Sequence, residues 1–173
     1  MERTLKKLRE AEFFYVAMSA EAERIMKPHP EALDFYLSAF VSAARSVTLA
    51  LQKEHKSQYD AWFPNWWVER LSDTERKRLE FFKGQRNSTL KEGAMATRGA
   101  VEVIPLWKLQ QELELAGGSL QVWGTPGAPP PNTTERLALE FDDPVGGSVV
   151  NVCGEQLAVL RRLVTEFQEY VAA

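Results

Sequence analysis

One segment, residues 31–55, most constrains how this chain can fold, because its apolar residues would cover almost the whole circumference of a helix. The apolar residues that recur there at steps of three and four are Leu33, Tyr36, Phe40, Ala44, Val47 and Leu51. Other apolar residues widen this stripe, and a helix that is apolar nearly all round is expected inside a protein. The segment therefore predicts a helical bundle with residues 31–55 at its centre.

A row of serines lies within the same segment. Ser38, Ser42 and Ser46 recur at four-residue spacing, and small side chains allow a neighbouring helix to approach closely. We therefore expect another helix to pack along this row. Arg45 also lies in the segment, so its guanidinium must reach a carboxylate or the solvent.

Helices are also expected on both sides of this segment. Residues 8–25 place apolar side chains at steps of three and four, and the prolines at 28 and 30 end that pattern. Further along, Ser72 and Glu75 form a capping-box pair, which predicts that a helix begins there. Gly93 suits the end of that helix, because glycine readily adopts the left-handed conformation.

The C-terminal segment predicts one more helix. Ser148 is a suitable N-cap, and an apolar stripe follows it to Val171. Gly154 weakens this helix by about 1 kcal/mol relative to alanine. Cys153 belongs to the stripe, so we expect its thiol to be buried and structural.

Residues 59–67 form a dense aromatic block with three tryptophans. Trp62 and Trp66 would share one face of a helix, and Pro64 is expected to kink that helix or to begin its second part. Tryptophans can stack on nucleic-acid bases. The many apolar neighbours favour the alternative, in which the block is a wedge in the core.

The residues between the two helical regions have a different pattern. Apolar and polar residues alternate at 101–103 and 113–115, and residues 120–123 and 136–141 also have the pattern of strands. A proline-rich loop spans 124–132. We predict a mainly α fold in a single domain, 1–173. Its parts are a helical bundle core (1–95), a β-rich antiparallel hairpin or sheet insertion with this loop (96–147), and a C-terminal helix on the bundle (148–173).

The charge is divided unevenly between the two halves of the chain. Residues 1–95 contain 16 Lys+Arg and 14 Asp+Glu, whereas residues 96–173 contain 5 and 10. The net charge of −3 argues against binding of duplex DNA through a broad cationic face. A single cysteine, a charged N-terminus and the lack of a long apolar run predict a cytoplasmic protein without a membrane span.

The sequence offers few groups for catalysis. The two histidines, His29 and His55, have no partner at metal-ligand spacing, and motifs for phosphate, dinucleotide or serine-nucleophile sites are absent. We therefore expect neither a metal nor a cofactor. The one polar cluster of interest runs from Arg86 to Lys91, as Arg-Asn-Ser-Thr-Leu-Lys. Arg86 falls on the apolar face of its helix, where an unpaired guanidinium is costly.

The chain resembles the HEPN family in two places. These are the cluster from Arg86 to Lys91 and the Phe-Tyr-Leu-Ser-Ala-Phe run of the central helix. HEPN domains are helical, often homodimeric, and occur in toxin–antitoxin, defence and RNA-processing systems. The resemblance covers residues 5–93 and the final helix. Active members carry Arg-x-x-x-x-His, often as Arg-Asn-x-x-x-His, and cleave RNA without a metal. The resemblance implies that Arg86 would stabilise charge on the scissile phosphate and that Asn87 would orient the site.

Lys91 stands where the family has its histidine. An ordinary lysine stays protonated at pH 7, so it does not replace histidine in acid–base chemistry. Asn87 and Lys91 share a helix face, and Lys91 complements the helix C-terminus. A structural alternative for Arg86 is a buried ion pair with a glutamate of the first helix, such as Glu12.

Three functional hypotheses follow. The first is a non-catalytic HEPN-like binding module that forms a homodimer and binds a protein partner or RNA. The second is a metal-independent ribonuclease that uses Arg86. The third is a structural or regulatory helical protein without a nucleic-acid role, in which the tryptophan block and the acidic C-terminal half form an interface.

Overall fold

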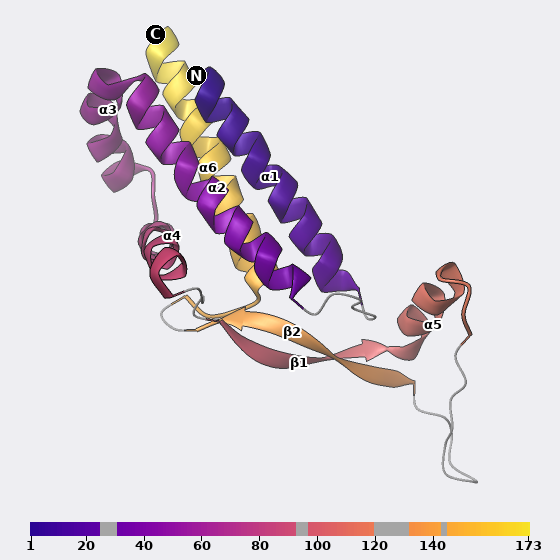
Figure 1. Ribbon diagram of the computed structural model, residues 1–173. Coiled ribbons are helices and arrows are strands. Elements are labelled where there is room, and N and C mark those ends of the chain that lie inside the picture. Colours follow the sequence, from indigo (N-terminus) through magenta and orange to yellow (C-terminus); the bar gives the residue numbers. More distant parts are fainter. Residues whose placement is uncertain (25–30, 93–96, 120–131, 143–144) are drawn as a thin grey trace.

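The computed structural model describes residues 1–24, 31–92, 97–119, 132–142 and 145–173, without the side chains of residues 86–92, Val101, Glu135 and Leu137. Its elements, shown in Figure 1, are α1 (Glu2–Glu23), α2 (Ala32–Glu54), α3 (Lys56–Glu69), α4 (Asp73–Glu92), β1 (Thr97–Pro105), α5 (Leu106–Leu115), β2 (Thr133–Phe141) and α6 (Val149–Ala172). The predicted mainly α fold with a small antiparallel β insertion is confirmed.

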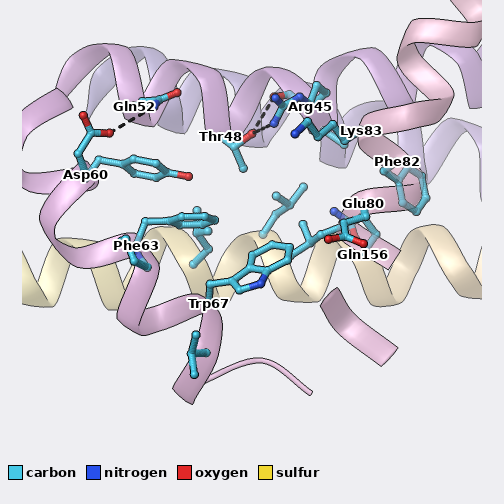
Figure 2. A pocket seen from close by; sticks show the side chains of 17 residues that line it. Arg45, Thr48, Gln52, Asp60, Phe63, Trp67, Glu80, Phe82, Lys83 and Gln156 are labelled. Atoms are coloured by element: carbon cyan, nitrogen blue, oxygen red, sulfur yellow. Dashed lines mark hydrogen bonds between the residues drawn. The ribbon is translucent and has the colours of Figure 1, made fainter. Parts of the chain in front are cut away.

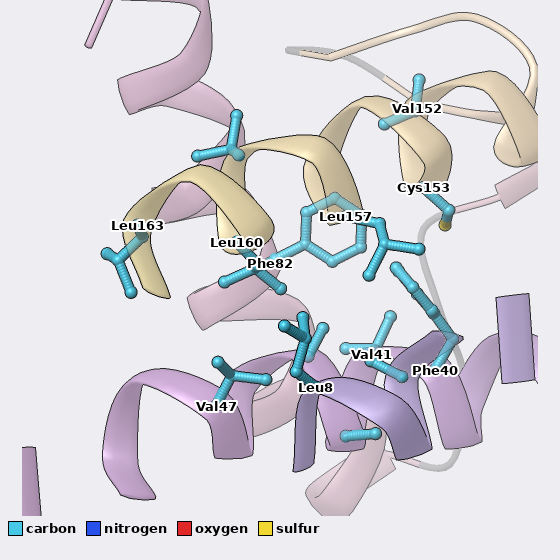
Figure 3. Packing of buried hydrophobic residues seen from close by; sticks show 14 of the residues in the cluster. Leu8, Phe40, Val41, Val47, Phe82, Val152, Cys153, Leu157, Leu160 and Leu163 are labelled. Atoms are coloured by element: carbon cyan, nitrogen blue, oxygen red, sulfur yellow. The ribbon is translucent and has the colours of Figure 1, made fainter. Parts of the chain in front are cut away.

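Three long helices form the bundle. In Figure 1, α1, α2 and α6 run side by side, while α3 and α4 flank α2. The largest side chains that are fully buried between the elements are Phe40, Phe141, Phe167, Met18, Leu37, Leu51, Leu157, Leu160 and Leu163. Figure 3 shows how Phe40 and Val41 of α2 meet Phe82 of α4 and Leu157 of α6 in this core.

The insertion is a long two-stranded ribbon. β1 and β2 pair antiparallel, with Thr97 opposite Phe141 and Pro105 opposite Thr133. Phe141 is fully buried and contacts the rings of Phe81 and Phe82, so it anchors the ribbon to α4. The other end of the ribbon carries α5 (Figure 1).

One predicted strand is wrong. Leu113 and Leu115, assigned to a strand from their alternation, lie in α5. The helix ends in a Schellman motif, in which the Gly118 amide donates to the Leu113 carbonyl over 2.7 Å and Gly117 has a φ of 79°. The two glycines therefore end a helix rather than turn a hairpin. The strand predicted at 120–123 and the proline-rich loop at 124–131 lie outside the described residues.

The predicted helix starts are confirmed. Glu31 precedes α2, and the amide of Ser72 donates to the Glu75 carboxylate over 2.8 Å while the amide of Glu75 donates back to the Ser72 hydroxyl over 3.3 Å. This is the predicted capping box at the start of α4. Ser148 is the N-cap of α6, although its hydroxyl makes no capping bond.

The aromatic block forms α3 and lies against α6. The helix runs through Pro64, so this proline does not begin a second part. Trp62 and Trp66 stack with ring centroids 5.5 Å apart, and the Trp66 indole donates to Glu166 over 2.7 Å. Trp66 is buried, and Trp62 contacts the buried ring of Phe167. The core-wedge interpretation is therefore confirmed for these two residues.

The central position of α2 is confirmed only in part. The helix contacts α1, α3, α4 and α6, but it leaves one strip exposed. Phe35 has 64% of its surface exposed and Leu49 38%, and Ser42 between them is exposed as well. The expected packing of a helix along the serine row is thus wrong at Ser42. Ser46 instead donates a hydrogen bond to the Ser42 carbonyl within α2.

Candidate functional site

A cavity of about 640 Å³ lies among four helices, and we call it the interhelical cleft. Its lining residues are Ala44, Arg45, Thr48 and Gln52 of α2, Tyr59, Asp60, Phe63, Pro64, Trp67 and Val68 of α3, Leu79, Glu80, Phe82 and Lys83 of α4, and Gln156, Leu160 and Leu163 of α6. Figure 2 shows the cleft from close by. Its volume lies in the range of about 300–1,000 Å³ that is usual for ligand pockets.

The walls of the cleft follow from the order of the helices. Only His55 separates α2 from α3, so the chain turns sharply and α3 lies beside the C-terminal half of α2. The capping box at Ser72 then begins α4, which places Leu79 and Phe82 opposite α3. The apolar stripe of α6 closes the floor with Leu160 and Leu163.

Gln156 is the unusual residue of this floor. Its side chain is only 2% exposed, and its Oε1 atom has no hydrogen-bond partner in the part of the chain that the structure describes. Gln156 lines the cleft from α6, and Figure 2 labels it beside Glu80. An unsatisfied buried polar atom costs about 1–3 kcal/mol of stability. The atom is itself closed off, so a molecule in the cleft does not reach it in this arrangement.

Arg45, Thr48 and Tyr59 are polar residues on the α2–α3 side of the cleft. The Arg45 guanidinium donates to the Thr48 hydroxyl over 2.9 Å, and that hydroxyl donates to the Arg45 carbonyl. Burial raises the pKa of the Tyr59 hydroxyl well above its ordinary value, although the nearby Arg45 charge opposes the shift. Tyr59 is therefore a neutral phenol at physiological pH, and it can both donate and accept a hydrogen bond.

The rim of the cleft carries charges of both signs. The ammonium of Lys56 and the amide of Gln52 donate to the Asp60 carboxylate, and these hydrogen bonds lower the pKa of Asp60. Glu80 and Lys83 lie on the α4 side, where both are exposed. The lining thus contains two cations and two anions, so the cleft has no net formal charge.

The residues predicted from sequence lie beyond the cleft on the same helix. Arg86 and Asn87 follow Lys83 by one turn of α4, and Lys91 follows one turn later. Their side chains lie outside the described residues, so their roles stay predictions. Glu12, the suggested partner of Arg86, bonds to Arg161 of α6 over 2.7 Å.

The cysteine and the histidines are the other residues that could support catalysis or bind a metal. The Cys153 thiol is buried as predicted, and burial raises its pKa. His55 contacts the ring of Phe167 at the α2–α3 turn, and His29 lies outside the described residues. In the described ranges, no cluster of His, Cys, Asp and Glu could hold a metal ion. No described helix is long and apolar enough to span a bilayer.

The sequence interpretation missed the cleft, although one signal was present. Gln156 follows Cys153 by three residues and precedes Leu160 by four, so helical periodicity places it on the buried face of α6. A lone amide on such a face needs a partner. The positions of α3 and α4 around it could not be predicted from the periodicity of one helix.

Comparisons with protein-family models, curated proteins and solved structures find no match for this chain.

Proposed function

We propose that this protein is a non-catalytic binding module whose interhelical cleft takes a small organic ligand. The observation that carries the proposal is the cavity of about 640 Å³ itself, in which aromatic and aliphatic side chains stand beside the polar groups of Arg45, Thr48 and Tyr59. Apolar walls would supply most of the affinity and these polar groups would orient the ligand.

The composition of the lining supports binding rather than acid–base catalysis. The described residues around the cleft include neither histidine nor cysteine. The carboxylate of Asp60 is held by Lys56 and Gln52, and its pKa is lowered, so it is a poor base. The pKa of Tyr59 is raised, which makes this hydroxyl a poor acid near neutral pH.

The proposal can be tested with 2-naphthol, a bicyclic aromatic compound that is small enough for the cleft. We expect saturable binding by isothermal titration calorimetry. Thr48→Trp should abolish it, because the larger side chain fills the cleft from α2. Thr165→Trp, at an exposed position on α6, should leave binding intact. Absence of saturable binding, or equal binding by both variants, would show that the cleft is not the ligand site.

We further propose that the module is a homodimer, which a second observation favours. The outer face of α1 and α2 exposes large apolar side chains, with Phe13 66% exposed, Val16 65% and Phe35 64%. The two helices that carry these residues lie side by side and antiparallel (Figure 1). A second copy of the chain would cover them.

The charges at the two ends of this outer face complement each other. The end formed by the start of α1 and the end of α2 exposes Arg3, Lys6, Arg9 and Lys53, against one acidic residue, Glu2. The opposite end exposes Glu23, Glu31 and Asp34, with Arg24 bonded to Glu21. A two-fold axis through the middle of the face would bring the basic end of one copy to the acidic end of the other.

The HEPN resemblance is consistent with a homodimer, but its further implications depend on Arg86 and Asn87. RNA or a protein partner, ribonuclease activity and a cytoplasmic location therefore stay predictions. The hypothesis of a purely structural helical protein is the alternative to the cleft proposal. It requires that no ligand enters the cleft.

A further inference from the structure

We infer that a second pocket, between α3 and α6, binds an organic cation that carries a quaternary ammonium group. This pocket, which we call the aromatic pocket, has a volume of about 390 Å³. Its walls include Trp62, Glu69 and Arg70 of α3 and Glu166, Glu169 and Tyr170 of α6. It shares no lining residue with the interhelical cleft, so the inference goes beyond the proposed function and does not depend on it.

The aromatic pocket presents ring surface to a ligand. Tyr170 is 44% exposed, and Trp62 lies partly buried beside it, with the two ring centroids 6.1 Å apart and the ring planes tilted by 30°. Trp66 stacks on Trp62 with centroids 5.5 Å apart and is itself buried, so it holds that ring in place. The face of an aromatic ring is electrostatically negative and attracts a cation, tryptophan most strongly.

The charge around these rings is negative. Three carboxylates and one guanidinium line the pocket. Glu166 accepts a hydrogen bond from the Trp66 indole over 2.7 Å and lies 3.5 Å from Nε of Arg70, which balances its charge. The side chains of Glu69 and Glu169 are exposed, and within the described residues they make no hydrogen bond or ion pair. Two negative charges therefore remain, and they favour a cation over a neutral compound or an anion.

The ends of two helices add to this attraction. α3 ends at Glu69, and Glu169 and Tyr170 lie in the last turn of α6, which ends at Ala172. The carbonyl groups at the C-terminus of a helix carry partial negative charge and stabilise a cation nearby. Neither of these two helices has a basic residue in its last turn. The backbone thus contributes to the same preference as the carboxylates.

A quaternary ammonium group fits this combination better than a primary one. A primary ammonium is strongly hydrated and needs acceptors for its three N–H groups, whereas Glu166 is already bonded. A trimethylammonium group has an apolar surface and a full positive charge. It can lie against the rings of Trp62 and Tyr170 while Glu69 and Glu169 attract it. Choline-like compounds and the trimethylated lysine side chain of another protein share this group.

Titration calorimetry of the wild-type protein with choline and with 3,3-dimethylbutan-1-ol tests the inference. The alcohol has the shape of choline, but a carbon atom replaces the charged nitrogen. We expect choline to bind saturably and at least about tenfold more tightly than the alcohol. An acetylated, amidated Ala-trimethyllysine-Ala peptide forms a second arm: tighter binding than choline indicates a protein side chain as the ligand, and weaker binding indicates a free cation. Equal affinities for choline and the alcohol, or no saturable binding of either cation, would overturn the inference.

Substitutions assign the binding to the aromatic pocket. Tyr170→Leu should weaken choline binding about fivefold, because it removes one ring, whereas Trp107→Leu removes a ring that is 60% exposed on α5 and should have no effect. Glu169→Gln should weaken binding about threefold, and Glu114→Gln, at an exposed position on α5, should not. Both changed pocket residues are exposed, so the variants should keep the wild-type thermal unfolding midpoint. Wild-type affinity in both Tyr170→Leu and Glu169→Gln would place the cation elsewhere and overturn the inference.

Discussion

The Thr4 hydroxyl of α1 donates a hydrogen bond to the Glu54 carboxylate of α2 over 2.6 Å. The same carboxylate accepts the backbone amides of Arg3 and Thr4, at 2.9 and 3.0 Å, so the last residue of α2 caps the first turn of α1. Burial alone would raise the pKa of Glu54, but these hydrogen bonds outweigh it and lower the pKa to about 2. Glu54 therefore connects the two ends of the helix pair.

Glu54→Gln should lower the free energy of unfolding by about 2 kcal/mol at pH 7, because it removes a charged acceptor from three hydrogen bonds. Since the folded pKa lies below the ordinary value of 4.5, the stabilisation is complete above about pH 4.5 and is lost as the pH falls toward 2. Urea unfolding at several pH values measures it. The difference between wild type and variant should shrink over that range.

The exposed residue Glu169 provides the control for this experiment. Glu169→Gln should change stability by less than about 0.5 kcal/mol at pH 7. A wild-type advantage over Glu54→Gln that stays constant between pH 4.5 and 2 would contradict the depressed pKa of Glu54.

Gly154 of α6 should not tolerate alanine, although helix propensity alone predicts a gain of about 1 kcal/mol. A Cβ atom there would lie 2.7 Å from the Tyr15 hydroxyl and 3.2 Å from its ring carbon Cζ. We expect Gly154→Ala to destabilise the protein by about 1 kcal/mol in thermal unfolding, since the α1–α6 contact must open. Gly84→Ala is the matched control, because nothing lies within 4 Å of its added Cβ, and it should stabilise.

Phe13→Asp should convert the proposed dimer into a monomer, since it places a charge in the centre of the outer face of α1 and α2. Size-exclusion chromatography with light scattering measures the change. Trp107→Asp, at a residue 60% exposed on α5, should leave the dimer intact. Raising the salt concentration should weaken the wild-type dimer, because its two ends attract each other through charge. A wild-type monomer at high protein concentration would refute the proposed homodimer.

Arg86 should not support RNA cleavage, because Lys91 stands where the HEPN motif that residues 86–91 resemble would have its histidine. With labelled RNA and EDTA, we expect wild type and Arg86→Ala to show the same background degradation. Cleavage that Arg86→Ala abolishes and Lys77→Ala preserves would establish the ribonuclease instead. If RNA is a partner, a titration should show binding that weakens steeply with salt, and Arg86→Ala should weaken it further.

Local signals along the chain predicted the helices well. The capping box joins Ser72 and Glu75, which are three residues apart, so the sequence alone predicts it. The end of the helix periodicity near Pro28 is likewise visible in the sequence. The mistake at Leu113 and Leu115 has a local origin too, since two alternating leucines fit a strand and a helix equally well. Gly117 and Gly118, which follow them, are ambiguous as well, because glycine suits both the turn of a hairpin and the end of a helix.

The sequence by itself determined that the segments of the bundle, though not α5, become helices, and it located the buried stripes of α2 and α6, because both depend on the spacing of apolar residues along one segment. Only the tertiary structure decided that α3 and α4 enclose a cleft above Gln156, that Glu12 pairs with Arg161, and that Ser42 stays exposed. These relationships join residues of different helices. They depend on how the helices pack, which no single segment specifies.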